Sequence, residues 1–139
     1  MNEKFRSHVD SLHGKFEALV NMPPVKPLSV RRSLELPGIY LLSEGSNHLY
    51  AGRTRKLGQR IRNHCLGGSK HNQAVFAFRL AREATGKIIA DYAGDGRRAQ
   101  LVQDPEFKAH FDSSKLRIQG MDLRYVEEHD PLSQALLEI

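Results

Sequence analysis

Hydrophobic residues recur every three or four positions near the start of the chain. Successive members of this series are 4, 3, 4 and 3 residues apart, namely Phe5, Val9, Leu12, Phe16 and Leu19. This spacing predicts an amphipathic helix over residues 3–21, which ends before the prolines at positions 23 and 24. The series is shorter than the roughly three to four heptads of a coiled coil, so we expect the helix to dock on its own domain. The proline-containing stretch 22–30 predicts an extended linker.

Two short apolar runs follow, at residues 39–42 and 48–51, with the turn-forming residues Gly45, Ser46 and Asn47 between them. This arrangement is typical of a β-hairpin. Tyr40 and Tyr50 would then lie within one or two residues of being cross-strand neighbours. Whether the two phenols share a face depends on the register of the strands, which the sequence leaves open.

The remaining pattern predicts helices and one more strand. Leu57, Ile61 and Cys65 repeat at four-residue spacing and predict a short helix, and a second helix should run from about Asn72 to Gly86. The pair Asp104-Pro105 has the form of an N-cap followed by a proline, which predicts a helix over 105–116.

Residues 121–128 alternate in polarity and predict a third strand. Asp130-Pro131 repeats the capping signature and predicts a final helix. Its expected apolar face consists of Leu132, Ala135, Leu136 and Ile139. These elements together predict an α+β domain with a small antiparallel sheet flanked by helices.

Positive charge is concentrated in one part of the chain. The 139 residues carry a formal charge of +5. The segment 45–82 holds eight basic residues and no acid, which leaves the rest with 13 positive and 16 negative charges, a net −3. A local basic patch is the electrostatic footprint of a protein that binds phosphates, although a solvated surface that lacks acids is the alternative. The eight residues are Arg53, Arg55, Lys56, Arg60, Arg62, Lys70, Arg79 and Arg82.

Other classes of protein are disfavoured. No apolar run approaches the roughly 18 residues that would span a bilayer, and the N-terminus begins no signal-peptide pattern, so we expect a cytoplasmic protein without membrane contact. The one cysteine, Cys65, can form neither an internal disulfide nor a zinc site by itself.

One constellation carries a resemblance to a known family. Gly38-Ile39-Tyr40 is followed after nine residues by Tyr50-Ala51-Gly52, and then by Arg60 and His64 in the predicted helix. This pattern resembles the GIY-YIG nuclease family, although the family usually has Ile or Val where Ala51 stands. The resemblance extends over residues 36–139 and implies a three-stranded antiparallel sheet flanked by helices. Residues 1–35 would form the separate N-terminal helix and linker. The apolar helical end at residues 136–139 leaves open whether the natural chain continues beyond residue 139 or ends there in a docked helix.

The resemblance also implies a phosphodiester-cleaving site. Tyr40 would be the general base, Tyr50 would position water or phosphate, Arg60 would stabilise the transition state and His64 would assist proton transfer. Glu138, in the segment Ala135-Leu136-Leu137-Glu138, would hold Mg2+ or Mn2+, which prefer oxygen ligands. Glu127 and Glu83 are the alternative metal ligands.

The expected partner is DNA. We predict that it is contacted by the basic and histidine side chains around the motif, namely Arg53, Arg55, Arg62 and His71. The substrate stays open among repair intermediates, recombination structures, foreign duplexes and recognition sites. The rival function is a nucleic-acid-binding module that keeps the fold and the basic patch but has lost the chemistry. A third alternative is a protein-interaction domain that uses the apolar stripe of the N-terminal helix.

Overall fold

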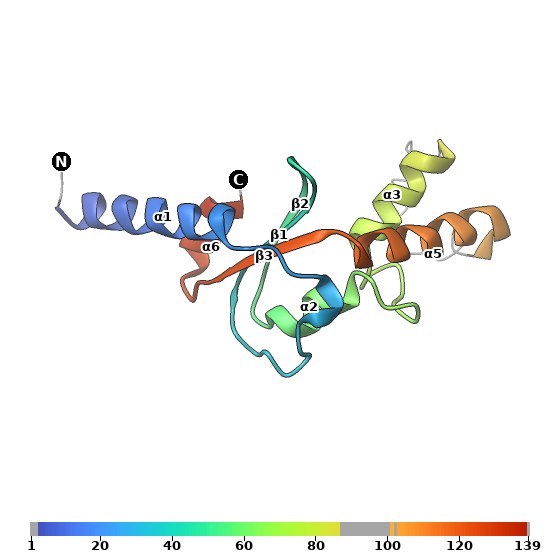
Figure 1. Ribbon diagram of the computed structural model, residues 1–139, viewed down its shortest axis with the longest axis horizontal. Coiled ribbons are helices and arrows are strands. Elements are labelled where there is room, and N and C mark those ends of the chain that lie inside the picture. Colours follow the sequence, from blue (N-terminus) through green and yellow to red (C-terminus); the bar gives the residue numbers. More distant parts are fainter. Residues whose placement is uncertain (1–2, 87–100, 102, 139) are drawn as a thin grey trace.

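A three-stranded antiparallel sheet forms the centre of the protein (Figure 1). The computed structural model describes residues 3–86, 101 and 103–138. The strands are β1 (Gly38–Glu44), β2 (Asn47–Thr54) and β3 (Asp122–Glu127), in the order β2-β1-β3. This arrangement confirms the predicted α+β fold and the predicted hairpin.

Helices cover the sheet at both ends of the elongated molecule. In Figure 1, α1 and α6 lie together at one end, whereas α3 and α5 pack against each other at the other. None of the described helices is long and apolar enough to cross a membrane. The helical elements are α1 (Glu3–Asn21), the 3-10 turn η1 (Pro27–Ser29), α2 (Leu57–Asn63), α3 (Val75–Thr85), α5 (Pro105–Gln119) and α6 (Pro131–Glu138).

The register of the hairpin settles which side chains share a face. Tyr40 pairs with Gly52 and Leu42 pairs with Tyr50. The two tyrosines are therefore two residues out of direct opposition on neighbouring strands, and both point to the same face of the sheet, because side chains alternate along a strand. A register shift between Leu42 and Ser43 fixes this pairing.

The two faces of the sheet bury different amounts of apolar surface. The face with Tyr40 packs against α2, α3 and α5 in a large core that contains Phe76, Phe107 and Phe111. The opposite face forms a small cluster, whose buried members are Leu19, Ile39, Leu41 and Leu137. The predicted site residues therefore lie on two different faces of the sheet. One face packs against a large apolar core, and the other against a small apolar cluster.

The linker before β1 packs against the domain. Val25 exchanges two backbone hydrogen bonds with Leu123 of β3 (2.9 and 2.8 Å), and Val30 is buried in the large core. The segment is therefore anchored at two points and contains the turn η1, in addition to the extended stretches that its prolines predicted.

The N-terminal helix docks by its C-terminal half. Leu19 is buried and Lys15 Nζ donates to the carbonyl of Glu127 (2.7 Å), but Phe5 is 58% exposed and Phe16 50%. The predicted helix is thus confirmed, with much of its apolar stripe left open to solvent.

The predicted apolar face of α6 is wrong. Leu132 is 61% exposed and Leu136 45%, while the buried residues are Ser133, Gln134 and Leu137; Ile139 lies outside the described residues. The cause is the N-terminal cap, in which the Asp130 carboxylate accepts hydrogen bonds from the Leu132 N–H and the Ser133 hydroxyl. Together with the bond from the Gln134 amide to the Glu128 carbonyl, this cap turns the polar residues of the first turn inward.

Candidate active site

Tyr40 and His64 meet inside the protein. Both side chains are fully buried, and the Tyr40 hydroxyl lies 2.6 Å from His64 Nε2. Tyr40 comes from β1, whereas His64 is the residue that ends α2. The Tyr40 ring covers Gly52, because a Cβ at that position would lie 2.3 Å from the phenol oxygen. A glycine two residues after Tyr50 is therefore a steric requirement for placing Tyr40 at this site.

Burial shifts the protonation of both partners. Burial, and next the nearby Tyr50, raise the pKa of Tyr40 well above its ordinary value. Burial, followed by the positive charge of Arg60, lowers the pKa of His64 to about 3. At neutral pH the pair is therefore a neutral phenol and a neutral imidazole joined by one hydrogen bond. The other ring nitrogen, His64 Nδ1, is buried and has no hydrogen-bond partner among the described residues.

Tyr50 and Arg60 border this pair. The Tyr50 ring lies 5.1 Å from the His64 ring and is stacked on Phe76 at 4.7 Å (centroid distances). Arg60 interacts with the Tyr40 hydroxyl and is half-buried, like Tyr50. It also lines an open pocket of about 330 Å3 together with Arg55. The guanidinium of Arg60 thus connects the buried pair with a cationic pocket that is open to solvent.

Glu138 lies near the edge of the sheet at β2. Its carboxylate pairs with Arg53 (3.4 Å), and both side chains are substantially exposed. Arg53 alternates with Gly52, so it leaves β2 on the face opposite Tyr40. Glu138 shares a pocket of about 310 Å3 with Tyr50, but within the described residues no hydrogen bond or ion pair joins it to Tyr40 or His64. The structure therefore brings together four predicted site residues, namely Tyr40, Tyr50, Arg60 and His64. Of these four, only Tyr50 lies beside Glu138.

Glu138 offers one carboxylate, whose ion-pair partner is the cation Arg53. The described part of the chain contains no group of three or more His, Cys, Asp or Glu residues that could hold a metal ion. Mg2+ is commonly held by one or two carboxylates, with water and substrate phosphates as its other ligands. A single half-exposed carboxylate fits that pattern. Of the alternatives, Glu127 is bonded to His129 (2.6 Å) and Glu83 pairs with Arg79 (3.8 Å).

The predicted DNA-contacting residues have different surroundings. Arg55 is exposed, and His71 lines a second pocket of about 260 Å3 beside Lys70 and Lys108. Arg62 holds the linker: its Nη1 donates to the carbonyls of Leu28 (3.0 Å) and Val30 (3.1 Å). Stabilising the linker is therefore one role of Arg62, whatever it contributes to DNA binding.

Two neighbours of the site have clear roles in the structure. Arg79 was predicted only as a member of the basic patch, but its guanidinium lies over the Tyr50 ring (5.7 Å) and the Phe76 ring (5.5 Å). Its position three residues after Phe76 in a helix was the available signal. Burial raises the pKa of the Cys65 thiol to about 11, so this thiol is not an activated nucleophile.

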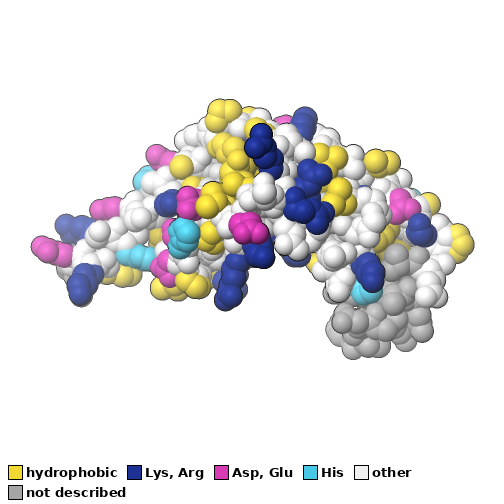
Figure 2. Space-filling model, turned by 90° about the horizontal axis from the view of Figure 1, so that it is seen from below, with side chains coloured by type: hydrophobic (Ala, Val, Ile, Leu, Met, Phe, Trp, Pro, Cys, Tyr) yellow, Lys and Arg dark blue, Asp and Glu magenta, His cyan; other side chains and the backbone are white. Residues whose placement is uncertain are grey.

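Charge is unevenly distributed over the surface. On the face in Figure 2, Lys and Arg side chains stand out over the middle of the molecule among exposed apolar ones, and many of the acidic side chains lie toward the α1 end. The acid-free segment 45–82 includes β2, α2 and most of α3. A polyanion would therefore be attracted to the elements that carry Arg60 and His64.

Comparison with known proteins identifies the segment that holds the buried pair. Residues 36–94 match the family model of the GIY-YIG catalytic domain. No curated protein and no solved structure matched the chain. The matched residues include Tyr40, Tyr50, Arg60 and His64, whereas Glu138 lies beyond them. This match confirms the resemblance to the GIY-YIG family over residues 36–94.

Proposed function

We propose that this protein is a divalent-metal-dependent endonuclease that hydrolyses phosphodiester bonds in DNA. The observation that carries the proposal is the 2.6 Å contact between the Tyr40 hydroxyl and His64 Nε2, which lies beside Arg60 in a segment that matches a catalytic domain. Hydrolysis needs a group that takes a proton from water and positive charge that stabilises the transition state. The three side chains supply both functions.

Tyr40 and His64 are proposed to act as a proton relay. A neutral phenol is a weak base, but its oxygen accepts a proton from the attacking water if its own proton moves to His64 Nε2. The water oxygen forms the new bond to phosphorus, and the bond from phosphorus to the leaving oxygen breaks. The leaving oxygen keeps the electron pair of that bond and takes up a proton from solvent. His64 ends this step as an imidazolium, and it returns to the neutral form by releasing its proton to solvent.

Arg60 is proposed to link substrate binding to this relay. Its planar guanidinium suits two phosphate oxygens. Burial lowers the His64 pKa most, and the Arg60 charge lowers it further. A bound phosphate offsets that charge, so His64 should become a stronger base once DNA is present. Glu138 would hold the Mg2+ or Mn2+ ion, which when bound neutralises charge on the phosphate and the leaving oxygen.

DNA is the proposed substrate because the cationic side chains extend beyond the reacting group. Arg55 and Lys56 line the open pocket beside Arg60. Arg53, on the opposite face of β2, is half exposed. These charges would bind phosphates on both sides of the scissile bond, together with His71 in the loop that follows α2 and with Arg62.

One observation favours the rival function of a non-catalytic nucleic-acid-binding module. Tyr40 and His64 are fully buried, so water has to reach them past Tyr50 and Arg60. A domain that had lost its chemistry could keep this pair for packing alone and still bind DNA through its basic surface.

Incubation with a panel of linear, branched and single-stranded DNAs separates the two functions. Each DNA is tested with Mg2+, with Mn2+ and with a chelator, and both binding and cleavage are measured. The proposed function predicts cleavage of at least one DNA that stops when the metal is chelated. Binding without cleavage of any DNA would support the rival function instead.

A further inference from the structure

Lys115 is a buried cation outside the segment that matches the family model. It lies on α5, and its side chain is 3% exposed. Removing an ammonium from water is costly unless it is paired and hydrogen-bonded. Burial lowers the pKa of Lys115, and the Asp112 carboxylate partly offsets this effect. An apolar residue would fill this position without the cost of burying a charge. The contacts of the ammonium therefore have to offset that cost.

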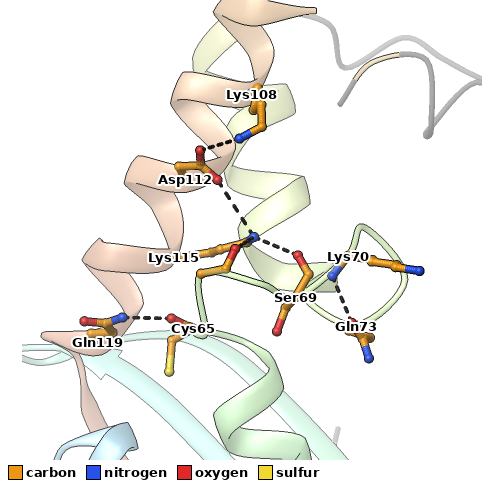
Figure 3. Close-up of polar contacts among 9 residues, drawn as sticks. Cys65, Ser69, Lys70, Gln73, Lys108, Asp112, Lys115 and Gln119 are labelled. Atoms are coloured by element: carbon orange, nitrogen blue, oxygen red, sulfur yellow. Dashed lines mark hydrogen bonds and ion pairs between the residues drawn. The ribbon is translucent and has the colours of Figure 1, made fainter. Parts of the chain in front are cut away.

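The Lys115 ammonium holds the loop that follows α2 (Figure 3). It donates to the carbonyls of Gly67 (3.0 Å) and Ser69 (2.7 Å), and its third neighbour is Asp112 at 3.9 Å. It also lies 4.1 Å from the centre of the Phe111 ring. Two of its three N–H donors are thus bonded to carbonyls of this loop, while Asp112 balances its charge from beyond hydrogen-bond distance.

Gln119 makes a second connection one helical turn further along α5. Its amide Nε2 donates to the carbonyl of Cys65 (2.8 Å), and Figure 3 shows this contact on the same side of α5 as Lys115. The carbonyls of Cys65 and Gly67 lie in the loop that follows α2. They are therefore bonded by α5, an element about 50 residues away in the sequence.

His64 lies directly before this connection, and its ring has few polar contacts. The Tyr40 hydroxyl bonds Nε2, while Nδ1 has no partner within the described structure. The orientation of the imidazole is therefore set by the rings around it and by its own backbone, which precedes Cys65 directly. A displacement of about 1 Å in a catalytic group is enough to cost on the order of 100-fold in rate.

We propose that Gln119 and Lys115 are positioning residues for His64. By holding the carbonyls of Cys65, Gly67 and Ser69, they fix the end of α2 so that the imidazole meets the Tyr40 hydroxyl. The effect on activity rests on the proposed nuclease function. The effect on the histidine ring does not, and the two are measured separately.

The first measurement is steady-state cleavage by Gln119→Leu and Lys115→Met. Both substitutions remove the donors at nearly constant side-chain size. Each should lower kcat about tenfold or more and change KM by less than about twofold, because the damage is to the reacting groups. Lys108→Met is the control: it removes the same charge from the same helix, but Lys108 bonds Asp112 rather than the loop, so kcat should stay at the wild-type value.

The second measurement is the 15N NMR signal of the His64 ring in the protein without DNA. The signals should shift or broaden in Gln119→Leu and stay at the wild-type position in Lys108→Met. If Lys115→Met does not fold, Gln119→Leu, which removes a neutral group, still carries the test. Wild-type ring signals in Gln119→Leu would overturn the proposal, even if its melting temperature falls. If the wild type cleaves no DNA, the nuclease function fails while the ring signals still decide the positioning role.

Discussion

The two faces of the central sheet hold their candidate site residues in different ways. On one face, Tyr40 and His64 are fully buried in the large core and joined at 2.6 Å. On the other, Arg53 and Glu138 are roughly half exposed and joined by one ion pair at 3.4 Å. Packing fixes the first pair, whereas an exposed ion pair contributes only about 0–1 kcal/mol and adjusts readily.

This difference suggests how the site divides its tasks. The proposed proton-transfer groups are pre-organised by burial, and such pre-organisation lowers the cost of reaching a transition state. The proposed metal ligand is held loosely by a cation that DNA and metal would both displace. Substitutions on the two faces should therefore have different effects. On the buried face they should change the cleavage rate and the stability together. At the exposed pair Arg53 and Glu138 they should change the metal dependence of cleavage alone.

The largest expected effect comes from Glu138→Gln. The change keeps the shape of the side chain and removes its charge, so metal-dependent cleavage should be abolished while DNA binding stays intact or becomes slightly tighter. The measurement is cleavage against Mg2+ and Mn2+ concentration. Glu83→Gln and Glu127→Gln, which alter the two alternative ligands, are the controls and should retain activity. Full metal-activated cleavage by Glu138→Gln would show that another acid holds the metal.

Arg60→Ala and Arg62→Ala should have different effects, the first mainly on the cleavage rate and the second mainly on stability and DNA binding. Arg60 borders the reacting pair, so its loss should lower kcat by about 100-fold or more, with a modest loss of DNA affinity. Arg62 donates to two linker carbonyls. Its loss should lower the free energy of unfolding by about 1–3 kcal/mol and weaken DNA binding more than it lowers kcat. Equal effects of both substitutions on kcat, affinity and stability would contradict this division.

A smaller effect is expected on the pH dependence of stability. The pKa of His64 falls from about 6.5 in the unfolded chain to about 3 in the folded protein. Between these pH values the unfolded state binds more protons, so stability is lost as the pH falls, by at most about 1.4 kcal/mol per pH unit from this group. Urea unfolding between pH 7 and pH 4 should show a shallower loss in His64→Gln, and His13→Gln, at an exposed position, is the control. Identical slopes in His64→Gln and the wild type would argue against a buried neutral imidazole.

The sequence predicts the elements on the buried face well. Two short apolar runs around a turn predicted β1 and β2, and the four-residue spacing of Leu57 and Ile61 predicted α2. The register needed the structure, because the shift between Leu42 and Ser43 has no distinct residue signature. The full burial of His64 was equally hidden, since its partner Tyr40 is distant in the sequence and a histidine among basic residues indicates a surface position.

The sequence predicts the opposite face less well. The apolar face expected for α6 is exposed because the Asp130 cap and the Gln134 amide decide which side of this short helix turns inward. Apolar periodicity over eight residues carries less weight than two specific hydrogen bonds. The contacts of Lys115 and Gln119 with the end of α2 could not be predicted either, because they join polar side chains to backbone carbonyls about 50 residues away.

The most direct test of the proposed relay is single-turnover cleavage by Tyr40→Phe. The substitution removes one oxygen atom from a buried ring and leaves the packing unchanged. The control is Tyr125→Phe, the cross-strand neighbour of Tyr40 on the same face of the sheet. With metal and a DNA that the wild type cleaves, Tyr40→Phe should be at least about 100-fold slower, with DNA affinity within about twofold of wild type, and Tyr125→Phe should cleave at nearly the wild-type rate. Wild-type cleavage by Tyr40→Phe would contradict the assignment of Tyr40 as the general base.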